Sequence, residues 1–203
     1  MAHLPAGEKA NAQHRGTEAM APRNRALALA ARTLTLSRFA SVAPFVWLLF
    51  HAASGESLGA RLALASLYGL VVLSDFLDGR LARRAGAASA TWARADVGAD
   101  VLFNFSSLVA AAWIGLVGPW VAAGVALLGG RFLWSLFLGE VREDGPGKLA
   151  GVLFYALVGW IVAEVAAGGL TGRFVVARAG DAVFLYTLAV FFSRWRPMSS
   201  RRR

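Results

Sequence analysis

Six long apolar stretches constrain the fold of this chain more than any other feature of its sequence. Each is close in length to the ~20 residues that a helix needs to cross a lipid bilayer. With 57% hydrophobic and 16% charged residues, the chain is too apolar for an ordinary soluble domain. We therefore predict an all-α membrane protein, whose six transmembrane helices cover residues 37–54, 58–78, 96–117, 119–139, 149–168 and 175–193.

The segments outside the apolar stretches are polar or basic. Residues 1–21 contain no apolar run, and we predict that they are disordered. Residues 22–36 mix arginines with leucines and alanines, which favours a helix lying in the membrane interface; a solvated helical lead-in to the first span is the alternative. Residues 22–196 are expected to form one membrane domain, followed by a basic tail at 197–203.

The positive charges fall mainly on one side of the predicted membrane topology. Of the 21 lysines and arginines, 17 lie on the side that holds both termini and the loop after the second span, and three lie on the other. This asymmetry predicts that the loop and both termini face the cytoplasm. The net charge of +9 is then explained by topology, and we expect no nucleic-acid partner. The absence of cysteine excludes disulfides and thiolate metal sites.

Four aspartates form the most unusual polar feature of the sequence: of six in the chain, residues 75–100 contain Asp75, Asp78, Asp96 and Asp100. Their spacing places each pair on one face of a helix. If these helices pack antiparallel across the small-residue turn 85–91, the carboxylates converge. Four anions need cations to share a site of low dielectric constant, and Mg²⁺ or Mn²⁺ suits such oxygen ligands. A site for two ions is expected here.

The same stretch resembles the signature of the CDP-alcohol phosphatidyltransferase family. The signature reads D-x-x-D-G-x-x-A-R, then eight residues of any type, a position that is usually glycine, and finally x-x-x-D-x-x-x-D. Its matching residues here are Asp75, Asp78, Gly79, Ala82, Arg83, Asp96 and Asp100. Trp92 stands at the position of the second glycine. The alternative is that the carboxylates lie together by chance at a solvated helix end.

The resemblance implies an enzyme that moves a phosphatidyl-type group from a CDP-linked lipid, usually CDP-diacylglycerol, to a hydroxyl and releases CMP. It implies that Asp75, Asp78 and Asp96 ligate metal, while Asp100, also part of the metal site, takes the proton of the acceptor hydroxyl. It further implies a homodimer in a bacterial cell membrane.

The resemblance also implies how the CDP-linked donor is held. Gly79 and Ala82 leave room for the nucleotide to approach the helix backbone closely. Arg83 pairs with the donor phosphates or supports an aspartate.

Three basic residues are candidates for binding the acceptor, by partial resemblance to bacterial phosphatidylglycerophosphate synthases. Arg38 follows Leu34-Thr35, although Arg32 replaces the usual asparagine. Arg131 lies within the fourth span, and Lys148 follows a glycine but lacks the second lysine and threonine of its motif. A guanidinium and an ammonium suit an acceptor phosphate such as that of glycerol 3-phosphate, a small polar alcohol.

Alternatives remain for these residues and for the function. Arg131 can instead pair with a carboxylate, and Lys148 can be an ordinary topology charge. Other acceptors in the family are an inositol phosphate, serine or a second lipid. Trp92 motivates a different class, a non-catalytic membrane protein that binds divalent cations. Glu164 and Asp181 lie near the opposite membrane face and are given no catalytic role; Asp181 is expected to pair with Arg178.

Overall fold

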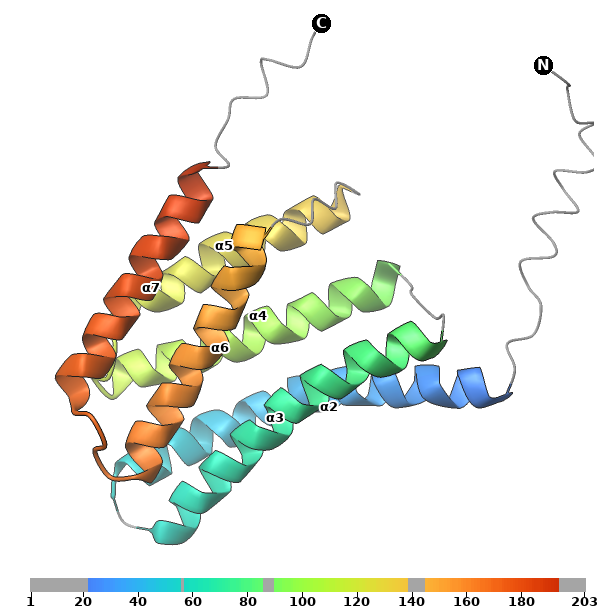
Figure 1. Ribbon diagram of the computed structural model, residues 1–203. Helices are drawn as coiled ribbons and strands as arrows, with labels where there is room; N and C mark the ends of the chain where they lie inside the picture. The colour runs from blue at the N-terminus through green and yellow to red at the C-terminus, as the bar shows by residue number, and fades with distance from the viewer. Residues whose placement is uncertain (1–21, 56, 86–89, 139–144, 194–203) are drawn as a thin grey trace, which may run out of the picture.

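The computed structural model describes residues 22–55, 57–85, 90–138 and 145–193, and this part of the chain forms six long helices without a strand (Figure 1). All six helices are long and apolar enough to cross a membrane. They are α2 (Pro22–Ala53), α3 (Leu58–Ala85), α4 (Ala90–Trp113), α5 (Pro119–Phe137), α6 (Gly145–Ala166) and α7 (Arg173–Ser193). The protein is therefore an integral membrane protein, and the predicted fold class is confirmed. The segment 1–21 and the tail 197–203 lie outside the described residues.

The first helix is longer than the sequence predicts. Residues 22–36, expected as an interfacial helix, continue without a break into the first span, so that α2 has 32 residues. At 1.5 Å per residue such a helix measures about 48 Å, against ~30 Å for the hydrocarbon core. A straight crossing by α2 therefore leaves its arginine-bearing first turns at the membrane surface.

Helix α2 organises the packing of the two helices that carry the aspartates. It packs extensively against both α3 and α4, whereas α3 and α4 make few direct contacts with each other in the described part of the chain. The two aspartate helices are therefore joined mainly through α2 and not through direct packing on each other, which was the condition under which their spacing predicts convergence. Arg38 of α2 lies between the two helices and contacts aspartates on both. Figure 1 shows α2 and α3 side by side beneath α4.

The remaining helices complete the bundle on the other side of α4. Helix α5 packs on α4, and α7 packs on α5 and α6. Helix α6 closes the bundle by contacting α3 and α4, together with α2. The aspartates on α3 and α4 are thereby flanked by α2, which carries Arg38, and by α6, which carries Tyr155.

Glycine permits the close approach of α6 to α3. A Cβ atom placed on Gly159 of α6 would lie 2.9 Å from the hydroxyl of Tyr68 on α3, closer than real Cβ contacts. Small residues at such points let transmembrane helices approach closely. The approach brings Tyr68 within hydrogen-bond distance of the α6 backbone, where its hydroxyl lies 2.6 Å from the carbonyl oxygen of Tyr155.

The apolar core lies next to the polar centre of the bundle. Phe45 of α2 and Phe103 of α4 are fully buried, and their ring centroids are 4.8 Å apart. Phe103 stands three residues after Asp100 and stacks on Tyr155 of α6 at 6.2 Å. Close-packed rings of this kind hold their neighbours in fixed positions. These ring contacts join α2, α4 and α6 next to the aspartates.

Candidate active site

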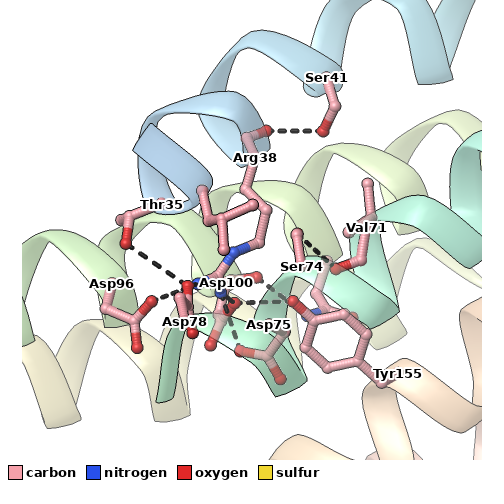
Figure 2. A network of polar contacts seen from close by, with 12 residues as sticks. Thr35, Arg38, Ser41, Val71, Ser74, Asp75, Asp78, Asp96, Asp100 and Tyr155 are labelled. Atoms are coloured by element: carbon pink, nitrogen blue, oxygen red, sulfur yellow. Dashed lines mark hydrogen bonds and ion pairs between the residues drawn. The ribbon is translucent and has the colours of Figure 1, made fainter. Parts of the chain in front are cut away.

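Arg38 of α2 lies at the centre of the four aspartates (Figure 2). Its side chain is fully buried, and its guanidinium pairs with all four carboxylates. One terminal nitrogen contacts Asp75, at 3.0 Å, and Asp100. The other contacts Asp78 and Asp96. The convergence that the spacing of the aspartates predicts is present, and an arginine from a third helix holds it together.

The four carboxylates differ in their access to the exterior. Asp78 is the deepest, with a side chain 6% exposed, and it also accepts a hydrogen bond from the hydroxyl of Thr35 at 3.5 Å. The side chains of Asp75 and Asp96 are 42% and 37% exposed. The cluster is therefore anchored at Asp78 and open at Asp75 and Asp96, where a ligand can reach it.

The cluster carries an excess of negative charge. Four ionised carboxylates and one guanidinium leave a formal charge of −3 among the residues in contact. A buried group of like charges is costly unless cations and hydrogen bonds compensate it. The site is therefore suited to binding further positive charge.

Three of the aspartates fit a divalent metal ion. Asp75, Asp78 and Asp96 each offer a carboxylate oxygen, and these oxygens lie within 4.8 Å of one another. Oxygens bound to one Mg²⁺ at its usual distance lie at most about 4.2 Å apart, so small side-chain rotations suffice. Carboxylate oxygens are the hard ligands that Mg²⁺ and Mn²⁺ prefer. These three residues are accordingly the ones that would hold an ion.

Asp100 has surroundings of its own. It lies one helical turn beyond Asp96 on α4 and is not a member of the three-carboxylate group. Its Oδ1 atom accepts a hydrogen bond from the hydroxyl of Tyr155 on α6 at 2.7 Å, and Arg38 contacts the same oxygen. The side chain of Asp100 is 29% exposed. It therefore combines fixed partners on one oxygen with access to the exterior.

The other predicted site residues lie on the same helices or near them. Gly79 follows Asp78 directly on α3 and is half-buried. Ala82 and Arg83 lie further along α3, but their side chains are outside the described residues. On α5, the guanidinium of Arg131 lies 5.6 Å from the ring centroid of Phe191. Lys148 is exposed in the first turns of α6.

Trp92, which departs from the family signature, contacts Arg32, which replaces the asparagine of the phosphatidylglycerophosphate synthases. The guanidinium carbon of Arg32 on α2 lies 5.0 Å from the ring centroid of Trp92 on α4. A cation over a tryptophan ring within about 6 Å is attracted by the ring. Arg32 lies one turn before Thr35, and Trp92 lies one turn before Asp96. The pair therefore lies beside the aspartates, at the outer end of the site.

The sequence alone does not predict two of the partners of the aspartates, Thr35 and Tyr155, and it predicts that Arg38 binds the acceptor. One signal was available for the first helix, because Thr35 and Arg38 are three residues apart and share a helix face at the start of the predicted first span. Tyr155 gave no such signal. It lies alone in an apolar stretch of α6, and only the packing of α6 against α4 brings it to Asp100.

The geometry of the site can now be set beside known proteins. The sequence model of the family described as CDP-alcohol phosphatidyltransferase matches residues 28–193. The chain belongs to this family. The match includes the four aspartates, Arg38 and Tyr155, and it extends from α2 to the end of α7. Membership in this family of CDP-alcohol phosphatidyltransferases implies a CDP-linked donor and an alcohol acceptor.

One curated relative is similar to this CDP-alcohol phosphatidyltransferase. It is described as a cardiolipin synthase (CMP-forming) from Streptomyces coelicolor, and it is 32% identical over 114 residues. The aligned part is 55% of this chain and 51% of the relative. The chain therefore matches about half the length of the relative.

Proposed function

We propose that this membrane protein transfers a phosphatidyl group from a CDP-linked lipid, such as CDP-diacylglycerol, to an alcohol acceptor and releases CMP. The observation that carries the proposal is the convergence of four aspartates at the positions of the family signature. A non-catalytic cation-binding protein would need the three-carboxylate group alone. The fourth carboxylate, on Asp100, has no role in such a protein, whereas a transferase needs a base for the acceptor hydroxyl.

The aspartates divide into two roles in this proposal. Asp75, Asp78 and Asp96 hold one or two Mg²⁺ or Mn²⁺ ions, since their oxygens lie close together. Bound there, the ions stabilise negative charge on phosphoryl oxygens and on the leaving CMP. Asp100 takes the proton of the acceptor hydroxyl, because it lies outside the three-carboxylate group and keeps a basic oxygen.

The donor is proposed to lie along the outer part of α3. Gly79 follows the metal-binding Asp78 and has no side chain to keep a nucleotide away from the helix. Ala82 and Arg83 continue this stretch in the direction of the loop. A guanidinium at residue 83 suits the diphosphate of the donor.

The acceptor is proposed to carry a glycerol hydroxyl next to a phosphate. The partial resemblance to phosphatidylglycerophosphate synthases supports free glycerol 3-phosphate. The Streptomyces relative supports a lipid acceptor, because cardiolipin contains two phosphatidyl groups joined by one glycerol. The substitution of the second motif lysine by Ala150, which is fully buried, also favours the lipid, since that site has lost a cation for a free phosphate.

An assay with purified protein tests both parts of the proposal. Labelled CDP-diacylglycerol and Mn²⁺ are incubated with glycerol 3-phosphate, phosphatidylglycerol, inositol phosphate or serine, and CMP release is measured. We expect release that depends on the ion and on a glycerol-bearing acceptor, with a lipid product of matching mass. The Asp100→Asn variant serves as the inactive control. If the protein binds Mn²⁺ but releases no CMP with any acceptor, it is a cation-binding protein and not a transferase.

The recognition of an acceptor phosphate can be tested at Arg131 and Lys148. Neutralising either residue, as Arg131→Gln or Lys148→Gln, is expected to raise KM for the acceptor by roughly tenfold or more, because a charge-assisted contact is lost. KM for the CDP-lipid should change less. Arg178→Gln, at the other end of the bundle, provides the matched control. An acceptor without charge would remove the basis for this assignment.

We propose that the active site and both termini face the cytoplasm of a bacterial cell, and that the protein is a homodimer. The asymmetry of lysine and arginine supports the orientation, and the Streptomyces relative supports the bacterial membrane. Single cysteines at Ser89 and Ser199 of this cysteine-free chain should resist an impermeant thiol reagent in intact cells. Labelling before lysis would reverse the orientation. Light scattering in detergent measures the number of subunits.

A further inference from the structure

The two carboxylate oxygens of Asp100 have different surroundings. Oδ1 accepts a hydrogen bond from the hydroxyl of Tyr155 at 2.7 Å and is also contacted by Arg38 (Figure 2). Oδ2 has no hydrogen-bond partner among the residues that the structure describes, while the side chain as a whole is 29% exposed. One oxygen is therefore held by the protein, and the other is open to a ligand.

Tyr155 is itself held from two sides. Its backbone carbonyl accepts a hydrogen bond from the hydroxyl of Tyr68 on α3 at 2.6 Å. Its ring stacks on Phe103 of α4, with ring centroids 6.2 Å apart. Gly159 permits the approach of Tyr68, because a side chain there would collide with the tyrosine hydroxyl. The phenol of Tyr155 is thus a fixed donor whose position is set by α3 and α4.

Arg38 contacts the same oxygen of Asp100, but it is shared with the other aspartates. Its guanidinium contacts four carboxylates, so its hydrogen bonds are divided among them. Tyr155 donates to Asp100 alone, and it comes from α6, on the other side of the carboxylate. A neutral donor also leaves the negative charge of Asp100 in place. A hydrogen bond dedicated to Asp100 is therefore what distinguishes Tyr155 from Arg38.

We propose that Tyr155 is a positioning residue that holds Oδ1 of Asp100 so that Oδ2 receives the proton of the acceptor hydroxyl. This proposal rests on the transferase function proposed above. In the step concerned, the acceptor oxygen forms a bond to the phosphatidyl phosphorus, and its proton passes to Oδ2. The bond between that phosphorus and the CMP oxygen breaks, and its electron pair leaves with CMP. A base misplaced by about 1 Å can cost roughly a hundredfold in rate.

Removal of the phenol hydroxyl tests the proposal with little change in shape. Tyr155→Phe is expected to lower kcat by roughly tenfold to a hundredfold, while KM for both substrates and the affinity for Mn²⁺ stay within about twofold. Tyr186→Phe is the matched control. The hydroxyl of Tyr186 also donates a hydrogen bond, at 3.2 Å, but to the backbone of Pro146, away from Asp100. The kcat of the Tyr186→Phe variant should equal that of the parent.

A thermal double-mutant cycle tests the contact without any turnover. Tyr155→Phe should lower the melting temperature of the parent by roughly 3–10 °C, and by clearly less when Asp100 is already alanine, because the charged acceptor is then absent. Non-additive melting shifts together with the selective loss of kcat support the positioning role. Additive shifts, or an unchanged kcat in Tyr155→Phe, overturn it while the transferase function stands. A parent that releases no CMP with any acceptor rejects both.

Discussion

At the end of the bundle where α3 meets its loop, four aspartates share one arginine, whereas the two acidic side chains that the structure describes in the opposite half, Glu164 and Asp181, have donors of their own. Glu164 of α6 is buried and accepts hydrogen bonds from the backbone and hydroxyl of Thr171, at 2.8 and 3.1 Å. The backbone of Gly172 donates a third, at 2.9 Å. This carboxylate holds the turn before α7 and is fully compensated.

The second acidic residue in that half is also compensated locally. Asp181 pairs with Arg178, three residues earlier on α7, at 3.1 Å, as the sequence predicts. It also accepts a hydrogen bond from the indole of Trp120 on α5 at 2.9 Å. Acids with such partners stabilise the fold and have little capacity left for a ligand. The aspartates around Arg38 carry a formal charge of −3 instead, which makes them the candidates for binding a cation.

The largest expected effects come from removing single charges among the four aspartates. Asp100→Asn should lower CMP release by roughly 10²- to 10⁴-fold and leave Mn²⁺ affinity largely intact, because a base contributes to the transition state and not to ion binding. Asp75→Asn, Asp78→Asn and Asp96→Asn should lose metal affinity as well. Calorimetric titration with Mn²⁺ and the CMP assay separate the two roles. Equal loss of metal affinity in all four variants would reject Asp100 as a free base.

Removing Arg38 should have the largest effect on stability. Arg38→Gln leaves four carboxylates without their shared cation, and breaking a buried ion pair typically costs about 3–5 kcal/mol. Arg178→Gln is the control in the opposite half. The side chain of Arg178 is 67% exposed, so its loss should cost at most about 1 kcal/mol. Unfolding followed by tryptophan fluorescence compares the two variants.

Adding Mn²⁺ should affect the stability of the two arginine variants differently. Saturating Mn²⁺ should recover part of the stability that Arg38→Gln loses, since divalent ions replace the missing positive charge. It should have no selective effect on Arg178→Gln. If Mn²⁺ raises the stability of neither the parent nor Arg38→Gln above that measured in chelator, the aspartates do not bind the ion as proposed.

Most of the fold follows from the length of apolar sequence, and the deviations have a physical cause. Hydropathy detects the part of a helix that lies in hydrocarbon, but the backbone continues to form hydrogen bonds beyond it. The second span, predicted at 58–78, therefore continues as α3 to Ala85. In the same way the basic residues 22–36 become the first turns of α2. Polar helix ends are thus the part that hydropathy cannot delimit.

The site could be predicted only in part, because spacing reports one helix at a time. Aspartates three and four residues apart must share a helix face, and this was sufficient to predict a cluster. The partners Arg38 and Tyr155 come from α2 and α6, and their positions depend on which helices pack between α3 and α4. No local pattern contains that information. The pairing of Arg32 with Trp92 was hidden for the same reason.

A smaller effect is expected from changing Glu164, the fully hydrogen-bonded carboxylate in the opposite half of the bundle. Glu164→Gln replaces a charged acceptor of three hydrogen bonds by a neutral amide and should cost about 1.5–3 kcal/mol. The kcat per folded molecule should not change, because Glu164 lies far along α6 from Tyr155 and the aspartates. A loss of turnover that exceeds the loss of folded protein would contradict the division between the two halves.

The smallest effect is expected at Trp92, where the chain departs from the family signature. A glycine would allow the backbone to pass close to substrate or to a neighbouring helix. The indole instead lies under the guanidinium of Arg32, and such a contact contributes about 0.5–1 kcal/mol at a partly exposed site. Trp92 is therefore packed against α2 while Asp96 and Asp100 keep their places around Arg38. We expect Trp92→Gly to keep transfer within about tenfold of the parent, equivalent to 1.4 kcal/mol in the barrier.

The pairing also predicts how the two departures interact. Because Arg32 and Trp92 contact each other, Arg32→Asn and Trp92→Gly should lower the melting temperature less in combination than the sum of their separate effects. CMP release by the double variant should stay close to that of Trp92→Gly, since neither side chain contacts the four carboxylates in the described structure. One result would contradict the catalytic role given to the four aspartates: a parent that releases no CMP and a Trp92→Gly variant that does. In that case the indole fills the substrate pocket, and the excess charge around Arg38 serves cation binding alone.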